Sequence, residues 1–224
     1  MAYFADRIDA GKRLASALAN FAGKNAIVLA IPRGGVVVGY EIAKALNSPL
    51  DVIIPRKIGA PGNPELAIGA MTEDGTIILD DALIRYMGVP VDYIKEESEL
   101  QKREIERRLK FYGQNEPYPN LRGYDVIIVD DGIATGSTMK AALASVKNRG
   151  AKTVTVAVPV APPSTIKELK KQADRVVCLY TPEYFQAIGQ FYTDFTQTTD
   201  EEVIQLLKQS KQKNGEKPAG VLTA

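Results

Sequence analysis

Two adjacent carboxylates lie where an apolar run meets a stretch of small and hydroxyl-bearing residues. The run at residues 125–130 ends in Asp130, Asp131 follows it, and residues 132–138 read GIATGST. A strand that leads through a glycine-containing loop into a helix directs backbone N–H groups, and the positive end of the helix, at an anion. The pattern therefore predicts a phosphate site, but one with two negative charges beside it.

The two carboxylates fit this site if the ligand carries hydroxyl groups as well as phosphate. They can accept hydrogen bonds from the vicinal hydroxyls of a ribose, and they can lie near a hydrated Mg²⁺, which prefers water together with one or two carboxylates. The alternative is an acidic strand end solvated at a turn, and the complete string up to Thr138 argues against it. The loop is not a Walker A motif, because Ser137 rather than lysine follows Gly136.

Composition excludes several kinds of chemistry. The chain of 224 residues has no histidine, which excludes a histidine-based triad or general base. Cys178 is its single cysteine, so an internal disulfide is impossible, no structural zinc site is expected, and a reducing cytoplasm is the expected location. A net charge of +1 gives no overall attraction to nucleic acid or membrane, and no apolar run approaches the ~20 residues of a membrane span.

The elements that must hold these residues are short apolar strands alternating with helices. The strands read as continuous apolar runs, which indicates burial on both faces and hence a parallel sheet. The alternation predicts an α/β, Rossmann-like sheet flanked by helices. The expected strands are 26–31, 50–55, 125–130, 152–160 and 175–180, and the expected helices between them are 6–22, 36–46, 137–149 and 163–172.

Two insertions interrupt this alternation. Residues 56–80 contain a glycine- and proline-rich loop and then a hairpin that turns at 73–75. Residues 92–112 form a charged helix, for which a solvated flank is favoured over a partner helix or a basic patch. A capping box at Thr199 opens a last helix, 200–211, and residues 213–224 are expected to form a disordered tail.

The strand, the acidic pair and the loop at residues 125–138 resemble the signature of the type I phosphoribosyltransferases. The resemblance covers about residues 25–185 and implies that family's fold, with a mobile loop or hairpin insertion and a C-terminal hood. It implies one domain, 1–212, with a helical insertion at 82–115 and the hood at 181–198. It also implies Mg²⁺-dependent transfer of ribose 5-phosphate from phosphoribosyl pyrophosphate (PRPP) to a nucleobase or another nitrogen nucleophile, with release of pyrophosphate.

The resemblance also assigns roles to residues. Asp130 and Asp131 would hold the ribose hydroxyls and, through water, Mg²⁺. The residues implied for the 5-phosphate are Gly132, Ile133, Ala134, Thr135, Gly136, Ser137 and Thr138. Pyrophosphate would bind to two segments. One is the loop after the first strand, which in this family often contains a non-proline cis peptide. The other is the end of the second strand, where the sequence is similar to that of the adenine enzymes. These residues are Arg33, Gly34, Gly35, Arg56 and Lys57. Taken alone, residues 33–35 are also compatible with a plain turn. Arg56 and Lys57 are also compatible with a solvated strand end.

The acceptor is less clearly indicated. Ala134 stands where 6-oxopurine enzymes of the family carry aspartate, so the loop is closer to adenine, uracil and orotate enzymes. Glu65 is the candidate acid or base, and a solvated carboxylate is an equal alternative. Tyr184 and Phe185 are expected to stack on a planar acceptor, or else to close the core or a dimer interface.

Two other functions stay open at this point. One is a PRPP-sensing regulator without catalysis, and the other is a hydrolase or transferase acting on a different ribose phosphate. A nucleic-acid partner is not expected, since the chain has neither a spare DNA-binding domain nor a basic balance, although RNA binding by 92–112 stays open. The resemblance alone implies a homodimer.

Overall fold

The computed structural model describes residues 3–113 and 120–213 and is built on a five-stranded parallel sheet. The strand order is β2-β1-β6-β7-β8, and every neighbouring pair is parallel. This confirms the predicted α/β fold. The strands are β1 (Ala26–Ala30), β2 (Leu50–Val52), β6 (Asp125–Val129), β7 (Thr153–Val160) and β8 (Arg175–Tyr180).

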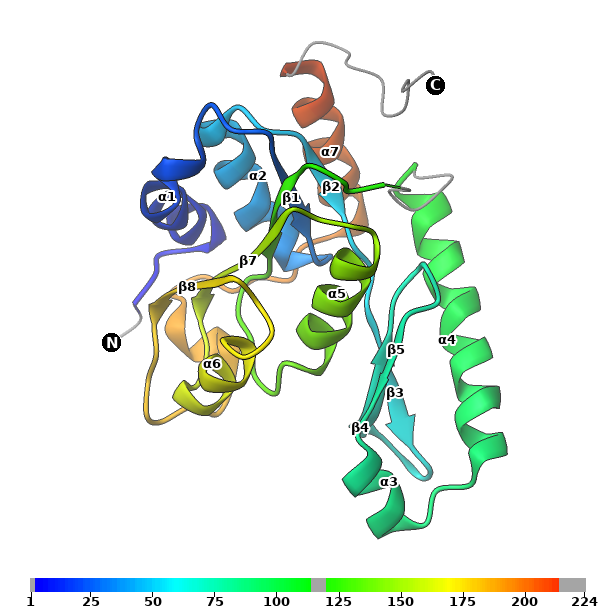
Figure 1. Ribbon diagram of the computed structural model, residues 1–224. Helices are drawn as coiled ribbons and strands as arrows, with labels where there is room; N and C mark the ends of the chain where they lie inside the picture. The colour runs from blue at the N-terminus through cyan, green and yellow to red at the C-terminus, as the bar shows by residue number, and fades with distance from the viewer. Residues whose placement is uncertain (1–2, 114–119, 214–224) are drawn as a thin grey trace, which may run out of the picture.

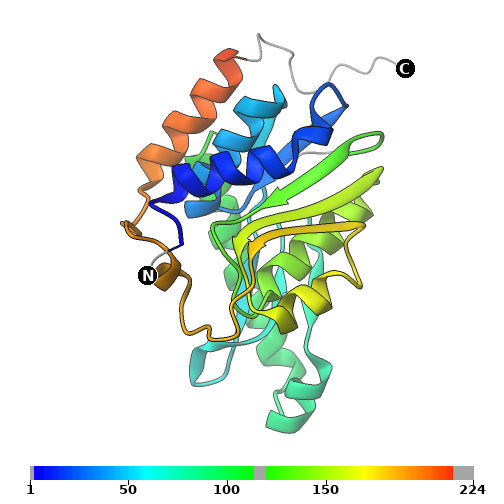
Figure 2. The same ribbon diagram turned by 90° about the vertical axis from the view of Figure 1, so that its left-hand side faces the viewer.

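Helices cover both faces of this sheet, as continuous apolar strands require (Figure 1, Figure 2). Successive residues of β1 point to opposite faces: Val28 and Ala30 pack with α1, α2 and α7, whereas Ile27 and Leu29 pack with α5 and α6. The helices are α1 (Arg7–Ala17), η1 (Ala19–Phe21), α2 (Gly34–Leu46), α5 (Ser137–Asn148), α6 (Pro163–Leu169), η2 (Ile188–Phe191) and α7 (Asp200–Lys213).

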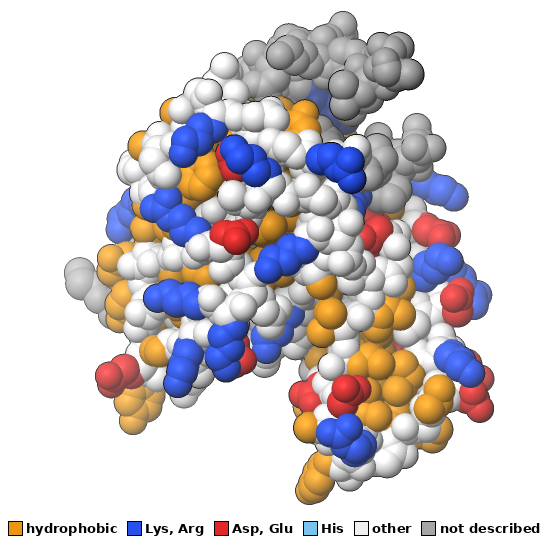
Figure 3. Space-filling model, viewed as in Figure 1, with side chains coloured by type: hydrophobic (Ala, Val, Ile, Leu, Met, Phe, Trp, Pro, Cys, Tyr) orange, Lys and Arg blue, Asp and Glu red, His pale blue; other side chains and the backbone are white. Residues whose placement is uncertain are grey.

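A second lobe stands beside the sheet and is made by the segment between β2 and β6 (Figure 1). It holds an antiparallel sheet of order β3-β4-β5 together with two helices. These elements are β3 (Arg56–Ala60), β4 (Asn63–Met71), β5 (Ile77–Leu79), α3 (Asp81–Met87) and α4 (Val91–Phe111). Apart from the first residue of α3, both helices fall inside the predicted insertion 82–115. Hydrophobic side chains gather on the visible face of this lobe (Figure 3). In the same lobe, Ile77, Ile78 and Leu79 of β5 are exposed.

The prediction of a glycine- and proline-rich loop at the start of 56–80 was wrong, because most of that stretch is strand. β3 and β4 form a hairpin there, with Ala60 paired to Asn63 across a two-residue turn. Gly62 has φ +73° in that turn, a left-handed conformation that favours glycine. Glycine and proline therefore serve a tight turn rather than an extended loop. The predicted hairpin at 73–75 is confirmed between β4 and β5.

The small sheet is tied to the large domain through the turn between β4 and β5. Glu73 forms an ion pair with Arg149 at the end of α5, 3.3 Å from oxygen to nitrogen, with both side chains almost fully buried. Its other oxygen accepts the backbone N–H of Ile54 at 3.1 Å. Next to it, Asp74 accepts a hydrogen bond of 2.9 Å from the Ser145 hydroxyl. The hairpin turn is thus docked on α5 by buried polar contacts.

The last helix agrees with the prediction for 200–211, and the predicted tail lies, apart from residue 213, outside the described residues. Within residues 3–113 and 120–213, none of the helices combines the length and the apolar character that crossing a membrane requires.

Candidate active site

The loops after β1 and β6 leave the same edge of the sheet, because these two strands are parallel neighbours with Ala30 opposite Val129. This brings the Arg33-Gly34-Gly35 segment against the acidic pair. A Cβ at Gly34 would overlap a carboxylate oxygen of Asp131, and one at Gly35 would lie 3.0 Å from the Asp130 Cα. The peptide bond before Arg33 is cis. Because Gly34 and Gly35 have no side chains, the loop after β1 can lie close to the acidic pair that follows β6.

The predicted phosphate loop runs from residue 132 to the start of α5. Gly136 takes φ +79° directly before the helix, and no side chain among the described residues caps the helix N-terminus. The loop is fixed from outside, since the Ile133 N–H donates to the Val160 carbonyl and the Thr165 hydroxyl donates to the Ala134 carbonyl. The first N–H groups of α5 are therefore available to an anion.

Hydroxyl groups surround the same helix end. The side-chain oxygens of Thr135 and Ser137 lie 3.3 Å apart. Thr135 is exposed and Thr138 is half-buried. The structure therefore brings together the backbone and the hydroxyl donors that the sequence predicted for this loop.

Asp131 is paired with a residue that the sequence analysis missed. Its Oδ2 lies 2.7 Å from Nε of Arg7, and both side chains are largely buried. The backbone carbonyl of Asp131 accepts a 2.6 Å hydrogen bond from the Tyr192 hydroxyl. One signal could have pointed to Arg7: it stands in the first turn of α1, where the helix dipole disfavours a cation, so another partner is required.

Asp130 differs from its neighbour in its electrostatic surroundings. Burial raises the pKa of Asp130 well above its ordinary value, and the adjacent charge of Asp131 adds to this rise. One of its oxygens accepts the Asp131 backbone N–H at 2.8 Å. The two carboxylates are thus not equivalent, because Arg7 forms its ion pair with Asp131 and not with Asp130.

The cationic residues predicted for pyrophosphate lie in different surroundings. Arg33 is half-buried at the beginning of α2. Arg56 begins β3 and donates from Nε to Gln101 of α4 at 2.8 Å; burial, followed by the nearby charge of Arg108, lowers its pKa. Lys57 is exposed. Arg33 is thus at the strand-end site, whereas Arg56 is held by the second lobe.

The proposed acid or base is not joined to this site. Glu65 is exposed in β4, and among the described residues no hydrogen bond links it to the loops after β1 and β6. The hairpin that replaces the expected loop carries Glu65 near its turn. The role of Glu65 therefore stays a prediction.

The segment 181–198 lies over the phosphate loop. A Cβ at Gly132 would meet the side chain of Ile188, so the two segments are in direct contact. Phe185 is half-buried against Phe191, with ring centroids 5.4 Å apart, whereas Tyr184 is 88% exposed. The aromatic residues in this segment therefore divide between packing and exposure, and their acceptor role stays a prediction.

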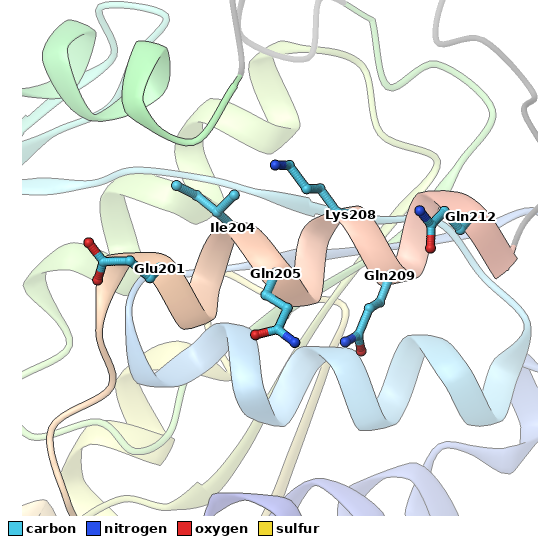
Figure 4. Close-up of a pocket in the computed structure, with 6 residues that line it drawn as sticks. All are labelled: Glu201, Ile204, Gln205, Lys208, Gln209 and Gln212. Atoms are coloured by element: carbon cyan, nitrogen blue, oxygen red, sulfur yellow. The ribbon is translucent and has the colours of Figure 1, made fainter.

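The structure has a pocket of about 400 Å³ that takes no part in this site. It runs along α7, where Ile204 and Lys208 project to one side of the helix and Gln205 and Gln209 to the other (Figure 4). None of the predicted site residues lines it. The candidate site is instead the set of loops at the carboxyl edge of the large sheet.

Metal binding at this edge would depend on the ligand. Across residues 3–113 and 120–213, no cluster of three or more acidic, cysteine or histidine side chains could hold an ion. Two adjacent carboxylates, one of them already paired with Arg7, suit a Mg²⁺ that keeps most of its water and is brought by phosphate oxygens. The residues present therefore fit a magnesium–phosphate ligand better than a resident metal ion.

We expect Gly34→Ala to destabilise the fold by about 1–3 kcal/mol, because the new Cβ would push into the Arg7–Asp131 ion pair. The cost should shrink when Asp131 is also changed to alanine, since this removes the overlapping carboxylate. Chemical denaturation of the single and double variants measures both effects. Equal costs in the two backgrounds would contradict the contact.

The sequence and the fold are similar to those of known proteins. Residues 5–196 match the family model described as a phosphoribosyl transferase domain, and this match includes Arg7. The crystal structure of TT1426 from Thermus thermophilus is 43% identical, covers 93% of this chain and 99% of its own, and superimposes with a TM-score of 0.79.

Two curated relatives come from Mycobacterium tuberculosis. MT0597 and Rv0571c, each named "Putative phosphoribosyl transferase", are 44% identical over 207 residues, or 92% of this chain. The match covers 47% of each relative, so the chain spans about half the length of the curated relatives.

Proposed function

Since the chain belongs to the phosphoribosyl transferase family, we propose that it transfers ribose 5-phosphate from PRPP to a nitrogen nucleophile, in the first place a nucleobase, and releases pyrophosphate. The observation that carries this proposal is the meeting of Asp131, Gly34 and the open N-terminus of α5 at one edge of the sheet. A ligand with a phosphate and two neighbouring hydroxyls matches this set of groups.

Each part of the site has a task in the proposed reaction. The N–H groups and hydroxyls of residues 132–138 bind the 5-phosphate, and Asp130 and Asp131 accept hydrogen bonds from the ribose hydroxyls. Arg33 and the backbone of Gly34 and Gly35 bind pyrophosphate. Arg56 and Lys57 are also assigned to pyrophosphate and would reach it from the second lobe.

The reaction breaks the bond between the anomeric carbon and the pyrophosphate oxygen and forms a bond from that carbon to the acceptor nitrogen. The nitrogen loses its proton and pyrophosphate takes the bonding electrons. Positive charge that develops on the sugar, as in related glycosyl transfer, lies near the carboxylates of Asp130 and Asp131. Arg33 offsets the negative charge that grows on the leaving group. A bound Mg²⁺ would supply further charge neutralisation at the phosphate oxygens.

The acceptor side is proposed from sequence alone. Ala134 favours an acceptor of the adenine, uracil or orotate kind over a 6-oxopurine. Phe185 and Tyr184 would stack on its ring, and Glu65 would take its proton. Glu65→Gln and Phe185→Ala are the first substitutions for an identified acceptor.

We further propose that the protein acts as a cytoplasmic homodimer. The single free Cys178 supports a reducing compartment such as the cytoplasm. The homodimer is supported by the family resemblance alone. A monomer in light scattering at working concentration would contradict the dimer.

The experiment that tests the function is pyrophosphate release from PRPP with Mg²⁺ in the presence of single acceptors. The panel is adenine, hypoxanthine, guanine, xanthine, uracil, orotate and simple amines. We expect release with one of them and loss of release on chelation of Mg²⁺. Binding of PRPP in calorimetry without release for any acceptor would favour a PRPP sensor. If the protein neither binds PRPP nor releases pyrophosphate, the proposal is overturned. Turnover of another phosphate ester would favour a hydrolase or transferase that acts on a different ribose phosphate.

A further inference from the structure

The first turn of α1 contributes a side chain to the strand-end site, although it is 124 positions away from it in sequence. Arg7 makes three separate contacts there. Its Nε donates to Asp131 at 2.7 Å, and its Nη1 donates to the Thr196 carbonyl at 2.8 Å. Its guanidinium lies 3.9 Å from the ring centroid of Phe195. One residue thus joins the signature carboxylate to the segment that covers the phosphate loop.

The surroundings of Arg7 differ from those of an ordinary helix arginine. Arg13 lies on the same helix and also pairs with a carboxylate, Asp9, but its side chain is 47% exposed and its partner is four residues away. The Arg7 side chain is 11% exposed. An exposed pair of the Arg13 kind contributes little, whereas a largely desolvated charge must keep its partner.

The backbone of Gly34 also packs against the Arg7–Asp131 ion pair. A Cβ at Gly34 would lie 2.6 Å from Nε of Arg7 and would overlap the Asp131 carboxylate. The ion pair therefore fills the space that the missing side chain leaves. Tyr192 holds the Asp131 backbone from the opposite segment with its 2.6 Å hydrogen bond. The orientation of the Asp131 carboxylate is consequently set by residues from three distant parts of the chain.

We propose that Arg7 is a positioning residue for ribose recognition: it fixes the Asp131 carboxylate toward the bound sugar and connects that carboxylate to residues 195–196. This inference rests on the proposed function, since it concerns the same ligand. It adds a residue of the N-terminal helix to a site that the sequence placed entirely within residues 25–185. Arg7 acts through Asp131 and not on the reacting atoms.

The test compares four proteins by calorimetry with PRPP and with ribose 5-phosphate: wild type, Arg7→Gln, Arg7→Lys and the control Arg13→Gln. We expect Arg7→Gln to weaken binding of both ligands about 10- to 100-fold, the range for a lost charge-assisted hydrogen bond. Lysine keeps the charge but not the planar group that stacks and donates to two acceptors, so Arg7→Lys should lie between. Arg13→Gln should bind as wild type does.

Thermal unfolding and a double variant separate positioning from a general loss of structure. If Arg7 acts through Asp131, Arg7→Gln should weaken binding far less in the Asp131→Ala background, where the acceptor of the Arg7 hydrogen bond is gone, than in wild type. Should Arg7→Gln not fold, Arg7→Lys in the two backgrounds gives the same comparison. With an identified acceptor, the loss should fall mainly on KM for PRPP.

Three results would overturn the inference. The first is a folded Arg7 variant that binds PRPP and ribose 5-phosphate as tightly as wild type. The second is a double variant whose loss of affinity equals the product of the losses in the Arg7 and Asp131 single variants. Loss of binding in Arg13→Gln equal to that in Arg7→Gln would show a merely structural role of α1. A wild type that binds neither ligand would overturn the proposed function as well, which distinguishes the two failures.

Discussion

Asp131→Asn is expected to lower the rate of phosphoribosyl transfer by at least about 10²–10³-fold, the range seen when one preorganised charge-stabilising group is removed. Asparagine keeps the shape of the side chain and an oxygen that can accept from Arg7 Nε, which now lies 2.7 Å away. It lacks the negative charge that would face the developing positive charge of the sugar. The fold should therefore persist while catalysis is lost.

The matched control for this substitution is Asp174→Asn. Asp174 accepts the backbone N–H of Val154 at 2.7 Å, at the start of β7 and thus at the opposite edge of the sheet. Its change should leave kcat and KM near wild-type values. Initial rates with the identified acceptor, together with thermal unfolding of each variant, provide the measurement. Full activity in Asp131→Asn would show that the site has been assigned to the wrong residues.

Arg149→Met is expected to destabilise the protein by about 3–5 kcal/mol, because it leaves a buried carboxylate without its partner. The side chain of Glu73 is 1% exposed and that of Arg149 is 7% exposed. Methionine fills much of the space but cannot neutralise Glu73. The loss should be seen as a lower midpoint in denaturant-induced unfolding, and it should loosen the attachment of the small sheet to α5.

The deficit in Arg149→Met should depend on pH in a defined direction. Burial raises the pKa of Glu73, whereas Arg149 lowers it. A carboxyl group with a raised folded-state pKa contributes stability that is complete below its ordinary value of 4.5 and is lost as pH rises through its folded-state value. Without Arg149 that value rises further, so the variant should lose more stability near about pH 8 than near about pH 5.

Lys171→Met serves as the control for the ion pair. Lys171 pairs with Glu168 at 2.6 Å, but its side chain is 61% exposed. An exposed pair contributes about 1 kcal/mol or less, so this variant should unfold close to the wild type at both pH values. A similar loss in the two variants would mean that the Glu73–Arg149 pair has no special role in joining the lobes.

The large sheet was predictable because its signal is local. The five apolar runs became the five parallel strands, and the string from Asp130 to Thr138 led directly into α5 as predicted. Each depends on residues that are close together in sequence. The hairpin of β3 and β4 was missed for a related reason, since glycine and proline give the same signal in a tight turn and in an open loop.

Arg7 could not be found in this way. Its partner lies 124 positions along the chain, and only the folded arrangement brings the first turn of α1 to the residues that follow β6. The mismatch between a cation and the first turn of α1 indicates that some partner exists, but it does not identify Asp131. The sequence therefore predicted the loop that leads from β6 into α5, but not the contact that Arg7 makes with Asp131 in that loop.

The second lobe leaves the large sheet after β2 and returns at β6, which pairs with β1 rather than with β2. The strand order of the sheet consequently does not depend on what the chain builds in between. The residues of the second lobe can therefore differ without a change in the strand order of the large sheet. Exchange of the second lobe for that of a relative, with the Glu73–Arg149 contact preserved, should therefore leave the large sheet intact.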